Sequence, residues 1–71
     1  MTRRFEFVGG NSAKFWEADC QGKNVTVRYG RLGTTGQVQT KTFASPDAAG
    51  HHAQKLIRQK QAKGYVECAA V

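Results

Sequence analysis

Arg28, Tyr29 and Arg31 bring two guanidinium groups and one aromatic ring together within four positions of the chain. In an extended strand, residues two positions apart point to the same side, so Tyr29 and Arg31 are expected to present a flat ring and a planar cation together. Arginine donates charge-assisted hydrogen bonds to phosphate, and an exposed ring can stack on a base or sugar. Gly30 would let another backbone approach closely. This combination of residues is typical of a nucleic-acid contact.

Two of the candidate binding residues allow a second interpretation. Tyr29 continues the alternation of the two valines that precede it, so it is either a stacking residue or part of the core or its rim. Lys41 lies on the next predicted strand. It contacts phosphate if its side of that strand continues the surface that holds Arg31, and otherwise it is an edge lysine that opposes aggregation.

The elements that must position these residues are predicted to be four strands and one helix. Alternating β-favouring residues predict strands over 3–8 and 14–20 and a third that runs from Val25 into Tyr29, where glycines break the pattern. A fourth strand is predicted over 37–44, polar on both sides apart from Val38 and Phe43 and therefore suited to an edge. Trp16, Ala18 and Cys20 share one side of the second strand. They are better core candidates than the opposite side, which begins with Phe15 and is otherwise acidic.

A helix is predicted from Pro46 to about Ala62. Ser45 is a favourable N-cap, proline is tolerated at the first helical position, and Gly64 is placed to end the helix. The helix has one apolar arc about 100° wide, formed by Ala49, Ala53, Leu56 and Ile57. The sequence therefore predicts an α+β fold, a twisted antiparallel sheet of about four strands with one helix packed on it. A single domain is expected over 1–71, with a core of about 3–67.

The charge distribution favours a polyanionic partner. Eleven Lys and Arg against five Asp and Glu give a net charge of +6, and the isoelectric point is about 9.8. Between Gln21 and Val66 the only acidic residue is Asp47. Four cations on the predicted helix have no acid at helical spacing, so they form either a solvated face or a secondary phosphate contact: Lys55, Arg58, Lys60 and Lys63.

Residues suited to catalysis or metal binding are sparse. His51 and His52 would point about 100° apart on a helix, and no third ligand has a usable spacing. No carboxylate pair or nucleophile with a matched base is suggested, so we expect a non-enzymatic protein without metal or cofactor. The two cysteines, Cys20 and Cys68, are expected to be reduced thiols. Without a run of about 20 apolar residues or a signal core, a cytoplasmic protein that does not enter the membrane is expected.

The stretch Arg28-Tyr29-Gly30-Arg31-Leu32-Gly33, followed by Gly36-Gln37, resembles the signature of the WGR domain. In that family Trp-Gly-Arg occupies the place of Tyr29-Gly30-Arg31, so this sequence departs from the pattern at the first position. The resemblance covers roughly residues 13–67, and it includes an aromatic strand around Phe15-Trp16, a later strand around Phe43 and a closing turn before Tyr65. WGR domains are found in poly(ADP-ribose) polymerases, where the domain helps to hold a DNA break, and as small stand-alone bacterial proteins.

The resemblance implies a module that binds DNA, at strand ends, breaks or nicks. The charge and aromatic placement point to Arg28, Tyr29, Gly30 and Arg31 as the binding residues, with help from Lys41, and a monomer is expected. The alternative is a protein-interaction module with an acidic partner and only non-specific affinity for polyanions, because in the polymerases the same domain also relays contacts to neighbouring domains.

Overall fold

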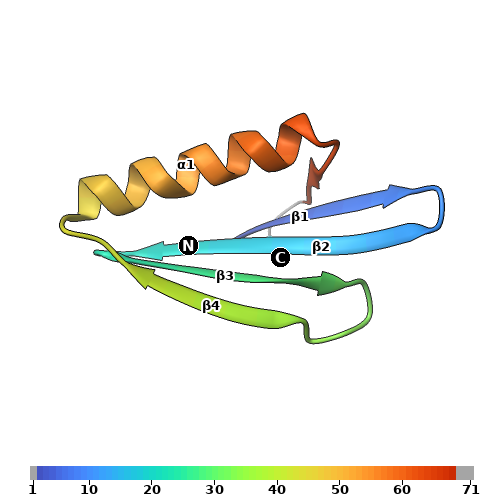
Figure 1. Ribbon diagram of the computed structural model, residues 1–71, viewed down its shortest axis with the longest axis horizontal. Helices are drawn as coiled ribbons and strands as arrows, with labels where there is room; N and C mark the ends of the chain where they lie inside the picture. The colour runs from blue at the N-terminus through green and yellow to red at the C-terminus, as the bar shows by residue number, and fades with distance from the viewer. Residues whose placement is uncertain (1, 69–71) are drawn as a thin grey trace.

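The computed structural model describes residues 2–68, which form two layers, a five-stranded antiparallel sheet and one helix across one of its faces (Figure 1). The elements are β1 (Thr2–Gly9), β2 (Ser12–Gln21), β3 (Asn24–Arg31), β4 (Gln37–Thr42), α1 (Pro46–Ala62) and β5 (Val66–Glu67). The strand order is β4-β3-β2-β1-β5, so α1 carries the chain back across the sheet before β5 pairs with β1. The α+β fold predicted from the sequence is confirmed, with one additional short strand.

The main core lies between α1 and the sheet. The register places Trp16 opposite Phe5 on one side and opposite Tyr29 on the other, so all three side chains point toward α1. The helix contributes a narrow apolar face and packs mainly against β2 and β3. The buried residues of this core are Phe5, Trp16, Ala18, Val25, Ala49, Ala53 and Ile57. The predicted core side of β2 and the predicted apolar face of the helix are therefore confirmed.

Phe15 forms a second buried site on the face of the sheet that α1 leaves open. Its side chain is only 1% exposed, although it points away from the main core. The loop between β3 and β4 folds over this ring so closely that a Cβ on Gly36 would lie 2.8 Å from Phe15 Cζ. The guanidinium carbons of Arg4 and Arg28 lie 4.7 Å and 5.4 Å from the ring centroid. The side of β2 that carries Phe15 was expected to be the poorer core candidate. Phe15 is nevertheless buried, because the β3–β4 loop and two arginines cover its ring on the face without a helix.

Both ends of α1 are fixed by the residues predicted to fix them. The Ser45 hydroxyl accepts a hydrogen bond of 3.1 Å from the Ala48 amide, and Pro46 occupies the first helical turn. Gly64 follows the helix with a φ of 103°, a conformation that other residues rarely adopt. The chain then turns back so that Tyr65 packs on Phe7, with ring centroids 5.5 Å apart. Within residues 2–68, α1 is too short and too polar to cross a bilayer.

Candidate nucleic-acid interface

Tyr29 and Arg31 lie at the C-terminal end of β3, on the face that α1 covers in part. The register places Lys14 of β2 directly opposite Arg31. Two like charges in this position repel each other, and such a pair is destabilising unless a counter-charge is present. Among the residues that the structure describes, no acidic side chain forms an ion pair with either of them. Lys14 and Arg31 therefore lie side by side without a counter-charge among the described residues.

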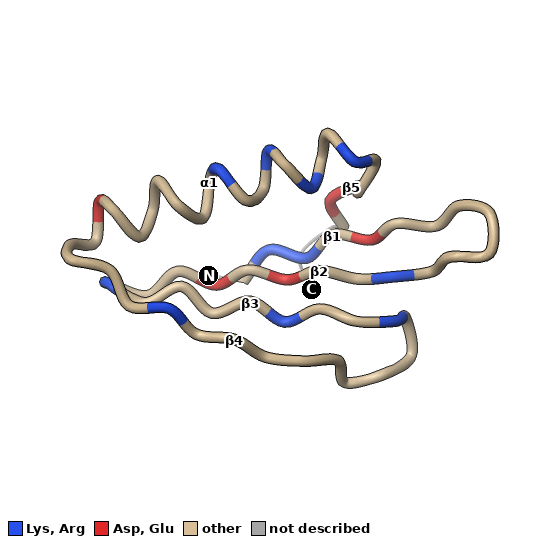
Figure 2. Tube along the Cα trace, viewed as in Figure 1, with Lys and Arg blue, Asp and Glu red and all other residues tan. Residues whose placement is uncertain are grey.

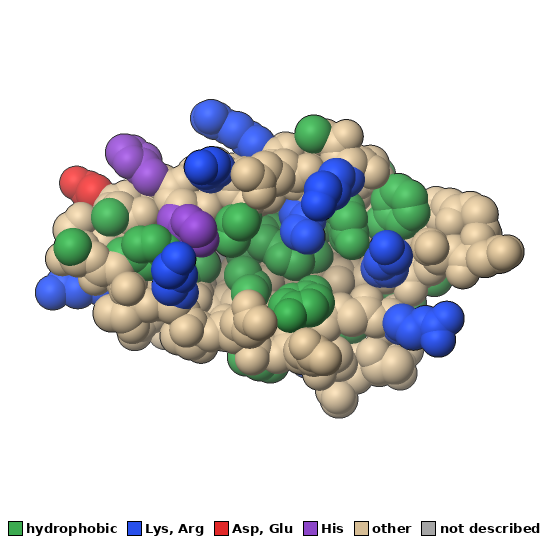
Figure 3. Space-filling model, in the orientation of Figure 1, with side chains coloured by type: hydrophobic (Ala, Val, Ile, Leu, Met, Phe, Trp, Pro, Cys, Tyr) green, Lys and Arg blue, Asp and Glu red, His purple; other side chains and the backbone are tan. Residues whose placement is uncertain are grey.

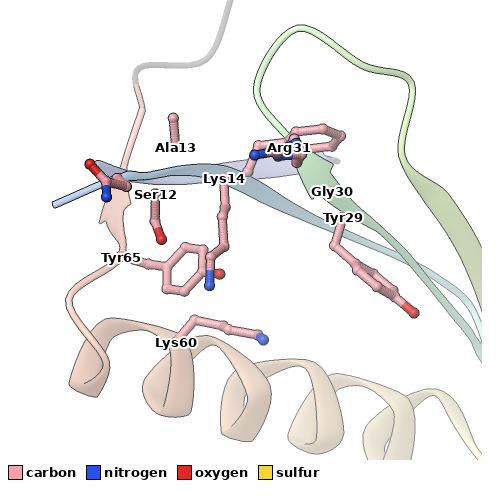
Figure 4. A pocket seen from close by; sticks show the side chains of 10 residues that line it. Ser12, Ala13, Lys14, Tyr29, Gly30, Arg31, Lys60 and Tyr65 are labelled. Atoms are coloured by element: carbon pink, nitrogen blue, oxygen red, sulfur yellow. The ribbon is translucent and has the colours of Figure 1, made fainter. Parts of the chain in front are cut away.

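A cavity of about 420 Å³ opens at this point, between the sheet and the last turns of α1. We call it the terminal pocket and define it by Lys14, Tyr29, Arg31, Lys60 and Tyr65 (Figure 4). In Figure 4 the side chains of Lys14 and Tyr29 leave the sheet on the side of the helix, and the side chain of Lys60 extends along the helix below them. The remaining lining comes from neutral residues, so within the described chain the pocket wall carries positive charge only.

Lys60 is held between two aromatic rings. Its Nζ lies 5.8 Å from the ring centroid of Trp16 and 5.4 Å from that of Tyr65. Burial lowers the pKa of Lys60, and the charges of Lys63 and Lys14 lower it further. An anion bound beside Lys60 would oppose all of these effects, because an opposite charge favours the protonated amine.

Tyr29 lies at the rim of the core and also lines the terminal pocket, so its position fits both the packing and the stacking interpretation. Its ring is half-buried and packs against the main core. Its hydroxyl donates a hydrogen bond of 3.3 Å to Gln37 Oε1 on β4, which orients the ring, and the same ring lines the terminal pocket. One edge is therefore fixed by packing while the rest is open to a ligand.

The structure separates Arg28 from Tyr29 and Arg31. Consecutive strand residues point to opposite faces, so Arg28 lies on the open face of the sheet. Its Nε and Nη2 donate to the two carboxylate oxygens of Glu17, at 3.1 Å and 3.0 Å. Arg4 donates to the same carboxylate, and the hydrogen bond from Arg28 is the main reason that the pKa of Glu17 is lowered. Arg28, Glu17 and Arg4 therefore form an ion-pair network, and both arginines lie over the Phe15 ring.

Lys41 shares the face of Tyr29 but lies at the other end of the sheet. It pairs with Val25, four residues before Tyr29, which is a separation of about 13 Å along the strand. Its Nζ lies 5.5 Å from the ring centroid of Phe43. Lys41 therefore lies on the same face of the sheet as Arg31, and its contact with phosphate stays a prediction. Figure 3 shows this surface: hydrophobic side chains run along the junction of helix and sheet, and Lys and Arg side chains surround them.

Charge is distributed unevenly along the elements (Figure 2). On α1, Asp47 is at the first turn and all the cations are in the second half, toward the terminal pocket.

The two adjacent histidines lie in different surroundings. His51 is exposed, whereas the ring of His52 packs on that of Phe43 with centroids 4.7 Å apart. Residues 2–68 contain no group of three His, Cys, Asp or Glu side chains that could hold a metal ion. Cys20 and Cys68 are both free thiols.

The comparison with known families decides the assignment. The model of the WGR domain family matches residues 1–70. The chain belongs to the WGR domain family. It is 40% identical to the Escherichia coli protein YfeS over 67 residues. The matched region makes up 94% of this chain and 28% of YfeS. It is also 40% identical over 65 residues to the Escherichia coli protein YehF, with 92% and 24% covered.

A solved structure has the same fold. The crystal structure of a protein from Bacteroides fragilis superposes with a TM-score of 0.95 and 49% identity, over 97% of this chain and 20% of that one. This WGR domain therefore spans about a quarter or less of the length of the proteins it matches. That residues 1–71 form a single domain, and that the protein is cytoplasmic, stay predictions.

The signature of this WGR domain is divided between the two faces of the sheet. Tyr29 and Arg31 face the terminal pocket, whereas Gly30 faces the opposite way, where a Cβ would lie 2.8 Å from Gly36 Cα. The close approach that Gly30 permits is therefore made by the chain's own loop, which covers Phe15. Lys14 was not predicted as a binding residue, because its position opposite Arg31 depends on how β2 pairs with β3.

Proposed function

We propose that this WGR domain binds DNA at strand ends, breaks or nicks, and that the terminal pocket is the contact. The observation that carries the proposal is the group of three cations, Lys14, Arg31 and Lys60, which line the same cavity as Tyr29 without an acidic neighbour in the pocket wall of the described chain. Membership of a family of nucleic-acid-binding type supports it. So does the net charge of +6.

The proposed role is binding without catalysis. Arg31 donates two parallel hydrogen bonds to a phosphate, and the lysines neutralise the same or the adjacent phosphate as point charges. The Tyr29 ring stacks on the base or sugar that a strand end exposes, since base–aromatic stacking needs no particular sequence. The half-buried position of Tyr29 keeps the ring in place, so little conformational entropy is lost on binding.

Fluorescence anisotropy with a short 5′-phosphorylated duplex and with a closed dumbbell of the same sequence tests this function. If Lys14, Arg31, Lys60 and Lys41 neutralise about four phosphates, log K should fall with log salt at a slope of about −3.6. The open duplex should bind more tightly than the dumbbell at physiological salt, and Tyr29→Ala should reduce that preference. Equal affinity for the two DNAs would exclude end stacking by Tyr29.

The same titration separates the alternative function. A module that serves to bind an acidic protein would keep its basic surface but would lose all DNA affinity at physiological salt, because non-specific polyanion binding depends only on counterion release. That outcome would reject the proposed DNA function and favour an acidic protein partner.

A further inference from the structure

A second cavity extends the terminal pocket along α1. It has a volume of about 650 Å³, and Tyr29 and Lys60 line both cavities. It exists because α1 packs on β2 and β3 and leaves β4 uncovered, so a trough remains between the helix and the outer strand. We call it the long groove and define it by Val27, Tyr29, Gln39, Lys41, His52, Leu56 and Lys60.

The lining of the long groove changes from apolar at its floor to cationic at its two ends. Val27 and Leu56 are half-buried, so each keeps apolar surface that a ligand can cover. Lys60 lies where the groove meets the terminal pocket. Lys41 lies beside Val25, about 13 Å along β3 from Tyr29. Of the described residues that line the groove, none is acidic. The charge complement of this surface is a narrow polyanion with apolar groups between its charges.

A single strand of nucleic acid presents a charged backbone together with accessible apolar base faces, whereas a duplex keeps its bases stacked inside. Proteins that bind single strands combine a cationic groove for the backbone with apolar or aromatic surfaces for the bases. In a duplex the bases are paired inside the helix and cannot reach a recessed floor. Gln39, exposed on β4, carries an amide that both donates and accepts hydrogen bonds and can therefore meet a base edge.

We propose that the long groove binds the unpaired strand that continues from a DNA end held in the terminal pocket, so that this domain prefers ends with a short single-stranded overhang. The inference rests on the proposed function and names the kind of end recognised. Tyr29 stacks at the junction of paired and unpaired DNA. Lys60 and Lys41 contact two separate backbone phosphates of the unpaired strand, and unpaired bases pack on Leu56 and Val27.

The test compares 5′-phosphorylated duplexes that are blunt or carry overhangs of two and four nucleotides, of either polarity, by fluorescence anisotropy. An overhang whose backbone adds one phosphate contact to Lys41 should tighten binding about tenfold. Gln39→Glu places a negative charge in the groove and should bring the ratio of overhang to blunt affinity close to one. Val38→Glu is the matched control: it is the adjacent residue, it is 61% exposed, and it points to the opposite face of the sheet. It should keep the ratio of the unmodified protein.

The outcomes are distinguishable. Tight binding of both blunt and overhang duplexes with equal affinity would overturn the groove proposal and leave the proposed function in place. No binding of any duplex at physiological salt would reject both. A polyglutamate peptide that displaces the overhang duplex at lower concentration than a thymidine oligonucleotide does would assign the groove to an acidic peptide and overturn the inference.

Discussion

Arg28 and Arg31 are three residues apart, and we expect alanine substitutions at the two positions to affect different properties, stability at Arg28 and DNA affinity at Arg31. Arg28→Ala should destabilise the domain with little effect on DNA affinity, since Arg28 bonds to Glu17 and covers Phe15 on the open face. Arg31→Ala should weaken DNA binding with little effect on stability, since Arg31 is exposed and faces Lys14 across the strand pair.

The magnitudes follow from these contacts. Arg28 makes two charge-assisted bonds, but its side chain is 40% exposed and Glu17 keeps Arg4 as a second partner, so a loss of about 1.5 kcal/mol is expected. In a domain of this size that corresponds to a fall in Tm of about 6–12 °C. Losing Arg31 removes one phosphate contact, which should cost about tenfold in affinity and reduce the salt slope by about 0.9.

Thermal unfolding followed by circular dichroism and DNA titration by anisotropy measure the two effects on the same samples. Arg58→Ala is the matched control, because it removes one exposed cation from α1 outside the terminal pocket and the long groove. If Arg28→Ala lost affinity at unchanged Tm, or Arg31→Ala unfolded, the assignment of the two faces would be refuted.

Three further predictions concern stability and ionisation. The pKa of Glu17 is lowered in the folded state, so ionised Glu17 stabilises the fold fully above its unfolded pKa of about 4.3, and this stabilisation is lost as the pH falls through the folded pKa. Glu17→Gln should therefore reduce the decline of Tm between about pH 5 and pH 3. Gly36→Ala should cost several times more stability, measured by urea unfolding, than Gly33→Ala: both have positive φ, of 72° and 89°, but only a Cβ at Gly36 would meet other atoms. Burial lowers the pKa of Lys60, so more of its amine is unprotonated and able to react with a small acylating reagent at pH 8; DNA should slow this reaction but not the reaction of Lys55, which lines neither the terminal pocket nor the long groove, and an equal effect of DNA on the two lysines, measured by mass spectrometry, would contradict this.

Periodic patterns made most of the fold predictable. Alternation with period two located β1 to β4 and the core side of Trp16, and the serine, proline and glycine signals located both ends of α1. β5 is only two residues long and has no pattern of its own, so its pairing with β1 depends on where Tyr65 packs. The burial of Phe15 was not predictable from strand periodicity, because it depends on the path of a glycine-containing loop.

The site was predictable only where its residues lie close together in the sequence. Period two placed Tyr29 and Arg31 on one face, and the same rule, applied strictly, places Arg28 on the other. Lys60 reaches the terminal pocket from α1, so its role depends on how the helix crosses the sheet. The long groove depends on the uncovered position of β4, which no local pattern in the sequence encodes.

The most direct test of the binding surface is an amide NMR titration of nitrogen-labelled protein with a 5′-phosphorylated duplex at physiological salt. The terminal pocket predicts that the largest shifts occur at Lys14, Tyr29, Arg31 and Lys60, while Thr26 and Thr40, which hydrogen-bond to each other across β3 and β4, stay nearly unchanged on the open face. The largest shifts around Thr26 and Arg28, with none in the terminal pocket, would place the DNA on the opposite face and contradict the account.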